Sequence, residues 1–254
     1  MPDAAKILGL DSLAVPRATT LKNAASATYL GQPPAFWGRY FHRPGQINSS
    51  GKKDSMYSAK ENAFLRANNI RLLPVARQTG RVDGTGADGA ADARHNVDAI
   101  YAEIPPAYLA GADPKVLVYL DVEGGNPLSA AYYRGWSETL LQYSQSASHG
   151  HVTLRPALYS GPLVDRTWTA LRTALGAGAA CFGAWMARYP HTDYQSIDWD
   201  EGHITPTQGA PIPILAWQYW ESANDAPAAL NFDTTLVSPF HSDVFLNGLI
   251  MPPP

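Results

Sequence analysis

The sequence predicts an α/β fold, a single (β/α)₈ TIM-type barrel, and two observations support this prediction. Short apolar runs of strand length alternate with longer stretches of helical spacing, which is typical of parallel β/α units. The chain has 254 residues, and a complete barrel of this kind needs about 250. We therefore expect one domain over residues 1–254 that uses the whole chain.

Eight apolar runs are the strand candidates, and no low-complexity linker separates them. Helical spacing is clearest over 57–68 and 129–143, and a further helix is expected to begin between Asp88 and Asp92. Ser58 is the expected N-cap of the first of these helices, with Glu61 as its capping-box partner. The strand candidates are residues 7–10, 35–41, 70–76, 115–125, 153–161, 180–189, 212–220 and 228–236.

Charge and composition exclude several kinds of partner. The net charge is −3 and the Lys and Arg residues are not clustered, so nucleic acid, which binds concentrated positive charge, is not expected. No apolar run approaches the roughly 18 residues of a transmembrane helix. The 13 Tyr and 7 Trp residues favour a surface that binds neutral, ring-shaped ligands such as sugars, although such rings also fill protein cores.

The N-terminus does not have the pattern of a secretion signal, because no basic region precedes an apolar core. The sequence leaves open whether the protein acts inside the cell, has been trimmed, or leaves by a route without such a signal. The single cysteine, Cys181, excludes an intramolecular disulfide and leaves the compartment open as well. We expect a monomer.

The run over 115–125 carries the most information about function. Tyr119, Asp121 and Glu123 are spaced two apart, so their side chains share one face of a strand, while Leu120 and Val122 take the other. The Gly pair at 124–125 marks the expected end of this strand. The alternation therefore predicts that both carboxyl groups point into the mouth of the barrel, at the end where this fold places catalysis.

Two neighbouring carboxyl groups raise each other's proton affinity, which can keep one protonated while the other stays charged. Glycoside hydrolysis needs this combination, an acid for the leaving oxygen and a carboxylate that steadies an oxocarbenium-like transition state or orients water. Two other interpretations of Asp121 and Glu123 are a metal site and a salt-bridged pair that holds the barrel mouth.

Other polar and aromatic residues fall at predicted strand ends. Asp11 follows the first strand, and Asp233 lies in the last strand, which closes the barrel beside the first. Trp185 belongs to the sixth strand, and Trp217 and Gln218 belong to the seventh. Each acidic residue could instead be a helix cap, but together they would face one another across a single opening.

No cofactor or metal is expected. The GTGADG segment lacks the ending and spacing of a nucleotide-binding loop and is expected at the barrel mouth. His149 and His151 have a spacing that could bind a metal, but they precede the fifth strand and so lie at the opposite end from Glu123.

With these motifs in order along the chain, the sequence resembles the family-25 glycoside hydrolases, the N-acetylmuramidases that cleave peptidoglycan. It resembles still more their glycoside-hydrolase-like relatives of unassigned activity, which share the barrel. The segments that carry the resemblance cover nearly the full length. They are GLDS at 9–12, VYLDVEGG at 118–125, ALYSG at 157–161, AWMARY at 184–189, AWQYW at 216–220 and NFDTTL at 231–236.

The resemblance implies roles for individual residues. Glu123 matches the general acid and Asp121 its partner, while Asp11 and Asp233 match acidic residues that line the groove. Three aromatic residues match positions that contact substrate: Tyr159, Trp185 and Trp217.

The chain also departs from the muramidases. Its third strand ends in LLPVARQTG where they usually carry a Tyr-His pair, and its second strand reads GRYFHRPG where they usually carry a lysine-containing motif. Both departures resemble the relatives of unassigned activity. Because those relatives often lack the strand-four glutamate, the presence of Glu123 favours catalysis, whereas the departures leave the substrate open.

We therefore expect a cofactor-free hydrolase of a β-linked amino-sugar polymer, with peptidoglycan as substrate and the cell envelope as its site of action. Gln218 is a further expected substrate contact. Arg39 and Arg188 are candidates to bind a lactyl or peptide carboxylate, with salt bridges the alternative.

Three other function classes are alternatives to this hydrolase. The first is a glycan-binding module that kept the barrel without turnover. The second is a chitinase-type enzyme, whose longer motif needs aspartates where this chain has Val116 and Tyr119. The third is a metal-dependent phosphodiesterase, for which histidines at strand ends are missing.

Overall fold

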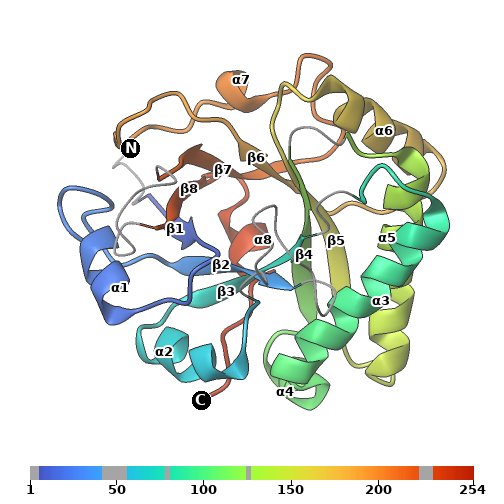
Figure 1. Ribbon diagram of the computed structural model, residues 1–254, viewed down its shortest axis with the longest axis horizontal. Coiled ribbons are helices and arrows are strands. Elements are labelled where there is room, and N and C mark those ends of the chain that lie inside the picture. The colour runs from blue at the N-terminus through green and yellow to red at the C-terminus, as the bar shows by residue number, and fades with distance from the viewer. Residues whose placement is uncertain (1–5, 42–55, 78–80, 124–126, 223–230) are drawn as a thin grey trace.

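The computed structural model describes residues 6–41, 56–77, 81–123, 127–222 and 231–254. In it eight strands form a closed barrel in sequence order (Figure 1), which confirms the predicted α/β barrel. The strands are β1 (Leu8–Asp11), β2 (Phe36–Phe41), β3 (Arg71–Arg77), β4 (Lys115–Val122), β5 (Thr153–Ser160), β6 (Ala184–Ala187), β7 (Ile214–Trp220) and β8 (Asp233–Val237). Each overlaps its predicted run, and β6 is much shorter than the run over 180–189.

The last strand departs from a regular (β/α)₈ pattern. All neighbouring pairs from β1 to β7 are parallel, but β8 runs antiparallel to both β7 and β1. The connection 221–232 has only about the minimum length of a crossover between parallel strands, whereas antiparallel neighbours need no crossover. As a result the beginning of β8, rather than its end, lies at the barrel mouth, where Asp233 pairs in register with Asp11.

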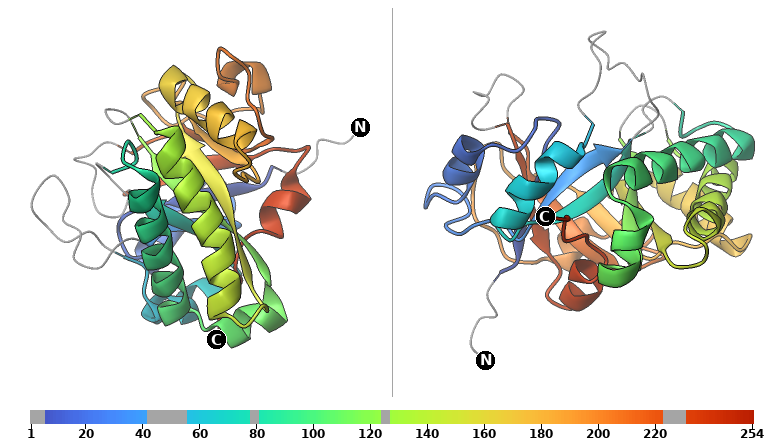
Figure 2. Two further views of the ribbon diagram at one scale, coloured as in Figure 1. Left: turned by 90° about the vertical axis from the view of Figure 1, so that its right-hand side faces the viewer. Right: turned by 90° about the horizontal axis from the view of Figure 1, so that it is seen from below.

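Helices surround the barrel, and the longest ones lie beside β4 and β5 (Figures 1 and 2). The 3₁₀ turn η1 (Ala59–Glu61) carries the predicted capping box of Ser58 and Glu61. No helix in the described ranges has the length and apolar character needed to span a membrane. The helices are α1 (Ala18–Ala24), α2 (Asn62–Ala67), α3 (Gly86–Glu103), α4 (Pro106–Ala112), α5 (Ala130–Ala147), α6 (Asp165–Gly176), α7 (Glu201–Ile204) and α8 (Ser242–Leu246).

The strands separate two apolar clusters, one inside the barrel and one under the helices. On β4, Leu117 and Tyr119 belong to the inner cluster, whereas Leu120 and Val122 belong to the outer one, as the alternation predicts. Phe245 of α8 joins the inner cluster. Its ring lies 4.9 Å from that of Phe36 and 6.3 Å from that of Tyr119, so α8 closes the end of the barrel where the strands begin.

Glycines allow α3 and α5 to pack against each other very closely. The two helices lie side by side (Figure 2). A Cβ atom on Gly135 would collide with the carbonyl oxygen of Gly86, and one on Gly89 would collide with that of Tyr132. The close approach of the two helices therefore explains why glycine occupies these positions, although glycine has a low helix propensity.

We expect Gly135→Ala to destabilise the protein by about 1–3 kcal/mol, because overpacking outweighs the gain in helix propensity. Gly111→Ala is the matched control, since nothing lies within 4 Å of a Cβ at that helical position. The control should be neutral or stabilising by up to about 1 kcal/mol. Urea unfolding of both variants measures this, and a Gly135 variant as stable as the Gly111 variant would contradict the close packing.

Candidate active site

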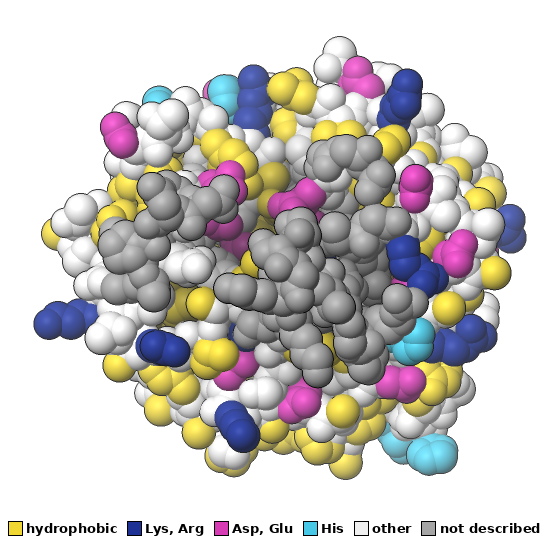
Figure 3. All heavy atoms as spheres, viewed as in Figure 1, with side chains coloured by type: hydrophobic (Ala, Val, Ile, Leu, Met, Phe, Trp, Pro, Cys, Tyr) yellow, Lys and Arg dark blue, Asp and Glu magenta, His cyan; other side chains and the backbone are white. Residues whose placement is uncertain are grey.

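A cleft of about 280 Å³ opens at the carboxyl ends of the parallel strands. Acidic side chains gather near the middle of this face (Figure 3). The described residues that line the cleft come from strand ends and from the segments that follow them. They are Ser12, Leu13, Tyr40, Arg77, Glu123, Glu221, Ser222, Asn231 and Asp233.

Glu123 and Asp121 occupy different environments at the end of β4. The strand ends at Val122, and Glu123 follows it with an exposed side chain that lines the cleft. Asp121 is 7% exposed, and one of its oxygens, Oδ2, lies 3.9 Å from Nε of Arg77. The other oxygen, Oδ1, is buried and has no hydrogen-bond partner among the described residues. The glycine pair expected to end the strand lies outside the described residues.

Burial decides the protonation of Asp121. Removal from water raises the pKa of this carboxyl well above its usual range, and the charge of Glu123 raises it further. The guanidinium of Arg77 acts in the opposite direction and lowers this pKa. The strand end therefore presents one buried carboxyl that resists ionisation and one exposed carboxyl within reach of a ligand.

A second pair of carboxyl groups meets across the junction of β1 and β8. Asp11 is 2% exposed and pairs in register with Asp233. The amide nitrogen of Gln218 donates to both, over 2.8 Å to Asp11 Oδ1 and 3.4 Å to Asp233 Oδ2. Tyr40 donates from its hydroxyl to Asp11 Oδ2 over 3.4 Å, and the backbone N–H of Ser222 donates to Asp233 Oδ1 over 3.0 Å.

Both carboxyl groups of this pair hold a proton more readily than a free aspartic acid. Burial and then the charge of Asp233 raise the pKa of Asp11 well above its usual range. Burial, together with the charges of Glu221 and Glu123, raises the pKa of Asp233 to about 7, although the N–H of Ser222 lowers it. Four predicted acidic residues, Asp11, Asp121, Glu123 and Asp233, are thus close enough to influence one another electrostatically.

Gln218 connects the carboxyl pair to two tyrosines. Its amide oxygen accepts hydrogen bonds from the hydroxyls of Tyr159, at 2.5 Å, and Tyr189, at 2.8 Å. Because both hydroxyls donate to the oxygen, the amide nitrogen faces the carboxyl groups of Asp11 and Asp233. Gln218 is 1% exposed, so its place is in this buried network beneath the cleft.

The predicted aromatic contacts are buried. Tyr159 is 5% exposed, and its ring packs on that of Trp185 with 4.4 Å between centroids, inside the barrel. Trp217 belongs to the outer cluster, where its indole nitrogen donates to the carbonyl oxygen of Arg188 at 2.7 Å and its ring faces His203. None of these three aromatic side chains lines the cleft. Their predicted contact with substrate stays a prediction.

The structure places neither predicted arginine in the cleft. Arg39 is fully buried, and its guanidinium pairs with Glu61 at 2.7 Å. It also donates to the carbonyl oxygens of Ser12 and Leu13 at 2.8 and 2.9 Å, so it holds the segment after β1 in place. Arg188 donates to the carbonyl oxygen of His203. The predicted alternative to ligand binding, a salt bridge, is what Arg39 forms. The expected salt bridge was one at the surface, whereas this pair with Glu61 is buried.

Several cleft residues are absent from the sequence-based prediction, and strand alternation could have identified two of them. Tyr40 shares the inward face of β2 with Phe36, whereas Arg39 shares the outward face with Trp37. Arg77 continues the inward alternation of Leu73 and Val75 on β3, one residue beyond the predicted run. Glu221 lines the cleft and Tyr189 donates to Gln218 beneath it, and both follow their strands without a comparable signal.

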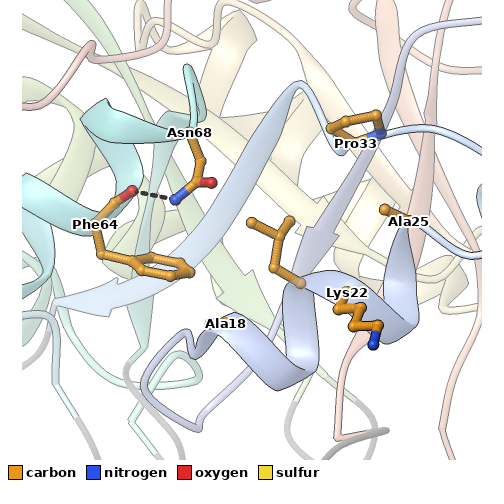
Figure 4. A pocket seen from close by; sticks show the side chains of 7 residues that line it. Ala18, Lys22, Ala25, Pro33, Phe64 and Asn68 are labelled. Atoms are coloured by element: carbon orange, nitrogen blue, oxygen red, sulfur yellow. Dashed lines mark hydrogen bonds between the residues drawn. The ribbon is translucent and has the colours of Figure 1, made fainter.

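The remaining candidates lie elsewhere. His149 is in the turn after α5, before β5, away from the cleft. The described residues contain no group of three or more His, Cys, Asp or Glu arranged to hold a metal ion. A second hollow of about 310 Å³ lies on the outside of the barrel between α1 and α2, lined by Lys22, Phe64 and their neighbours (Figure 4).

Comparison with known proteins agrees with this architecture. No protein-family model and no curated protein matches the chain. Among solved structures, an uncharacterized protein from B. stearothermophilus aligns over 96% of this chain and 99% of its own, with 22% identity and a TM-score of 0.70. A family GH25 lysozyme from Aspergillus fumigatus aligns over 96% and 99%, with 11% identity and a TM-score of 0.51.

The chain has the fold of the GH25 lysozymes. The catalytic domain of an endolysin from a bacteriophage of Listeria monocytogenes shows the same fold, with 18% identity, a TM-score of 0.55 and coverage of 97% and 99%. The fold implied by the sequence resemblance is therefore confirmed.

We expect Glu61→Gln to lower the free energy of unfolding by about 3–5 kcal/mol, because it leaves the guanidinium of Arg39 buried without its counter-charge. Glu138→Gln is the control, since it breaks an exposed pair with Arg134 worth less than about 0.5 kcal/mol. Urea unfolding compares the two variants. Equal stability would show that the buried pair does not hold the segment after β1.

We expect Asp233→Asn to change how stability depends on pH. A carboxyl with a pKa raised to about 7 binds more protons in the folded than in the unfolded protein, so stability falls as pH rises from about 4 to about 7. The variant has no carboxyl to ionise at this position and so does not lose this stability. The melting temperature of the variant minus that of wild type should therefore increase by several degrees from about pH 4 to pH 8. Exposed Asp193→Asn is the control, and parallel curves for Asp233→Asn and wild type would contradict the raised pKa.

Proposed function

We propose that this chain is a glycoside hydrolase that cleaves a β-linked amino-sugar polymer, with peptidoglycan as its substrate. The observation that carries the proposal is the exposed carboxyl of Glu123 in a cleft, directly beside the buried carboxyl of Asp121. The pairing of an accessible acid with a second carboxyl is what glycoside hydrolysis needs. Solved structures with this fold include a GH25 lysozyme and the catalytic domain of an endolysin, which supports the same class.

In the proposed mechanism Glu123 protonates the glycosidic oxygen, because it is the member of the pair that a polymer in the cleft can contact. Asp121 lies behind it and, once ionised in the substrate complex, steadies the positive charge that develops on the sugar ring, or it accepts a hydrogen bond from a substrate N-acetyl group that attacks from within. The Oδ1 of Asp121 has no hydrogen-bond partner among the described residues, and this supports the second role, since it can accept a hydrogen bond from the N–H of an acetamido group.

Asp233 lines the cleft and is the proposed residue that positions water, with Asp11 beneath it. The amide of Gln218 holds both carboxyl groups, and the tyrosine hydroxyls hold the amide, so the pair is oriented before substrate binds. We also propose that the protein is active as a monomer and that it acts on the cell envelope.

We expect Glu123→Gln to reduce the release of reducing ends from purified peptidoglycan by at least about 100-fold, since general-acid catalysis contributes on that order. The melting temperature should stay close to that of wild type, because the side chain is exposed. Glu138→Gln, on the exposed face of α5, is the control and should keep full activity.

A Glu123 variant that keeps full activity would contradict the mechanism. If neither wild type nor variant releases reducing ends while both bind the glycan, the protein is a glycan-binding module on a hydrolase fold.

A further inference from the structure

Exposed apolar side chains gather at the end of the barrel opposite the cleft, where α8 closes it (Figure 2). Phe240, in the turn before α8, is 73% exposed, and Val244 of α8 is 53% exposed. Phe182, in the segment that leads into β6, is 39% exposed. Because α8 buries Phe245 in the barrel and leaves Val244 outside, the helix presents an apolar face to its surroundings.

Backbone hydrogen bonds place these side chains around one rim of the barrel. The N–H of Phe182 donates to the carbonyl oxygen of Pro156 on β5 over 2.8 Å. The N–H of Ser238, two residues before Phe240, donates to the carbonyl oxygen of Leu215 over 2.9 Å, near the start of β7. The apolar side chains therefore belong to one end of the molecule and are not scattered over its surface.

Two cations lie at the same end. Lys115 begins β4 and is exposed, and the half-buried Arg155 lies on the neighbouring strand β5. The guanidinium of Arg155 covers the ring of Phe182, 5.0 Å from its centroid. Leu117, the register partner of Arg155, donates its N–H to the carbonyl oxygen of Gly248, just after α8, over 2.7 Å. The cations thus border the apolar face of α8.

The charges of these two cations are available to a partner. In the part of the chain that the structure describes, neither Lys115 nor Arg155 forms an ion pair with a carboxylate. Of the carboxylates near α8, Asp113 is engaged by Arg71 at 3.7 Å and accepts from the backbone of Met251, whereas Asp243 is exposed in the first turn of α8.

The two ends of the barrel differ in charge. Glu123, Glu221 and Asp233 line the cleft at the mouth, whereas Lys115 and Arg155 lie near the strand beginnings. An anionic surface therefore attracts the end closed by α8 and repels the mouth. Exposed apolar side chains gain nothing from a soluble polyanion. A bilayer with anionic headgroups matches both features, because it combines a negative surface potential with an apolar boundary below the headgroups.

We propose that the end of the barrel closed by α8 docks on the surface of an anionic lipid bilayer. Phe240 and Val244 enter the headgroup boundary, and Lys115 and Arg155 lie against the lipid phosphates. The contact is peripheral and leaves the cleft facing away from the lipid. This inference goes beyond the proposed function and does not depend on turnover in the cleft.

The test is co-sedimentation of the protein with vesicles of phosphatidylcholine that contain about one third phosphatidylglycerol, beside vesicles of phosphatidylcholine alone. Wild type should partition at least about 10-fold more strongly onto the anionic vesicles, because each cation near such a surface contributes about 5-fold. Added salt should weaken this binding, since it screens the charges. Equal partition onto both kinds of vesicle, or none onto the anionic ones, would overturn the proposal.

Two double variants separate the apolar and the charged parts of the surface. Phe240→Ser with Val244→Ser should lower partition onto anionic vesicles by at least about 10-fold, because apolar area no longer leaves water. Lys115→Gln with Arg155→Gln should lower it by about 20-fold. Melting temperatures check that both variants fold. Lys115→Gln alone, at an exposed position, should still cost about 5-fold if the Arg155 variant is unstable.

The matched control is Leu163→Ser with Arg166→Gln. Leu163 is 70% exposed, as Phe240 is, and Arg166 is an exposed cation, but both follow β5 and so lie at the mouth end. This variant should bind vesicles as wild type does. A control that loses as much binding as the two test variants would show that the attraction is not specific to the end closed by α8.

A probe at position 240 distinguishes lipid from other occupants of this surface. Phe240→Cys, made in a Cys181→Ser background and labelled with a polarity-sensitive dye, should shift its emission to the blue on anionic vesicles, whereas labelled Leu163→Cys should not. Two results would overturn the proposal. One is a dimer in lipid-free sedimentation velocity that Phe240→Ser with Val244→Ser abolishes. The other is binding to soluble polyphosphate that matches vesicle binding and is unchanged in that variant.

Discussion

The hydrogen bonding of β8 to both β7 and β1 is the constraint on which the rest of the site depends. It closes the barrel, and because β8 runs antiparallel its first residue lies where β1 ends. Asp233 is thereby placed opposite Asp11, within reach of the amide of Gln218 on the next strand. A parallel eighth strand would have carried this residue to the opposite end of the barrel, and the mouth would have one carboxyl fewer.

Bringing these carboxyl groups together has an electrostatic cost, and the surrounding side chains determine how much of this cost is offset. Burial raises the pKa of Asp11, Asp121 and Asp233, and the charge of Glu123 raises the pKa of each of them further. Donors from Gln218 and from the backbone of Ser222 offset part of the cost. Glu123 differs from the buried carboxyls because it stays exposed in the cleft. The difference between buried Asp121 and exposed Glu123 follows from the end of β4 at Val122.

Alternation along the strands predicted much of this arrangement and failed where a strand boundary or face was misjudged. On β4 the period of two correctly assigned Tyr119 to the interior and Leu120 to the outside. On β2 the charge of Arg39 suggested a ligand contact, although its neighbours on the same face, Trp37 and Phe41, belong to the outer cluster. Arg39 is buried there with Glu61, a residue 22 positions further along the chain, and only the tertiary fold brings the two together.

Local periodicity and the spacing of residues along one strand are enough to predict the barrel, the order of its strands and the placement of Asp121 and Glu123 together at one strand end. The direction of β8, the burial of Arg39 and Trp217, and the position of Arg77 in the acidic cleft do not follow from such local patterns. Each of these depends on contacts between segments distant in the chain. The free energy of burying a charged or aromatic side chain is set by the partners that the closed barrel supplies, and no local pattern contains them.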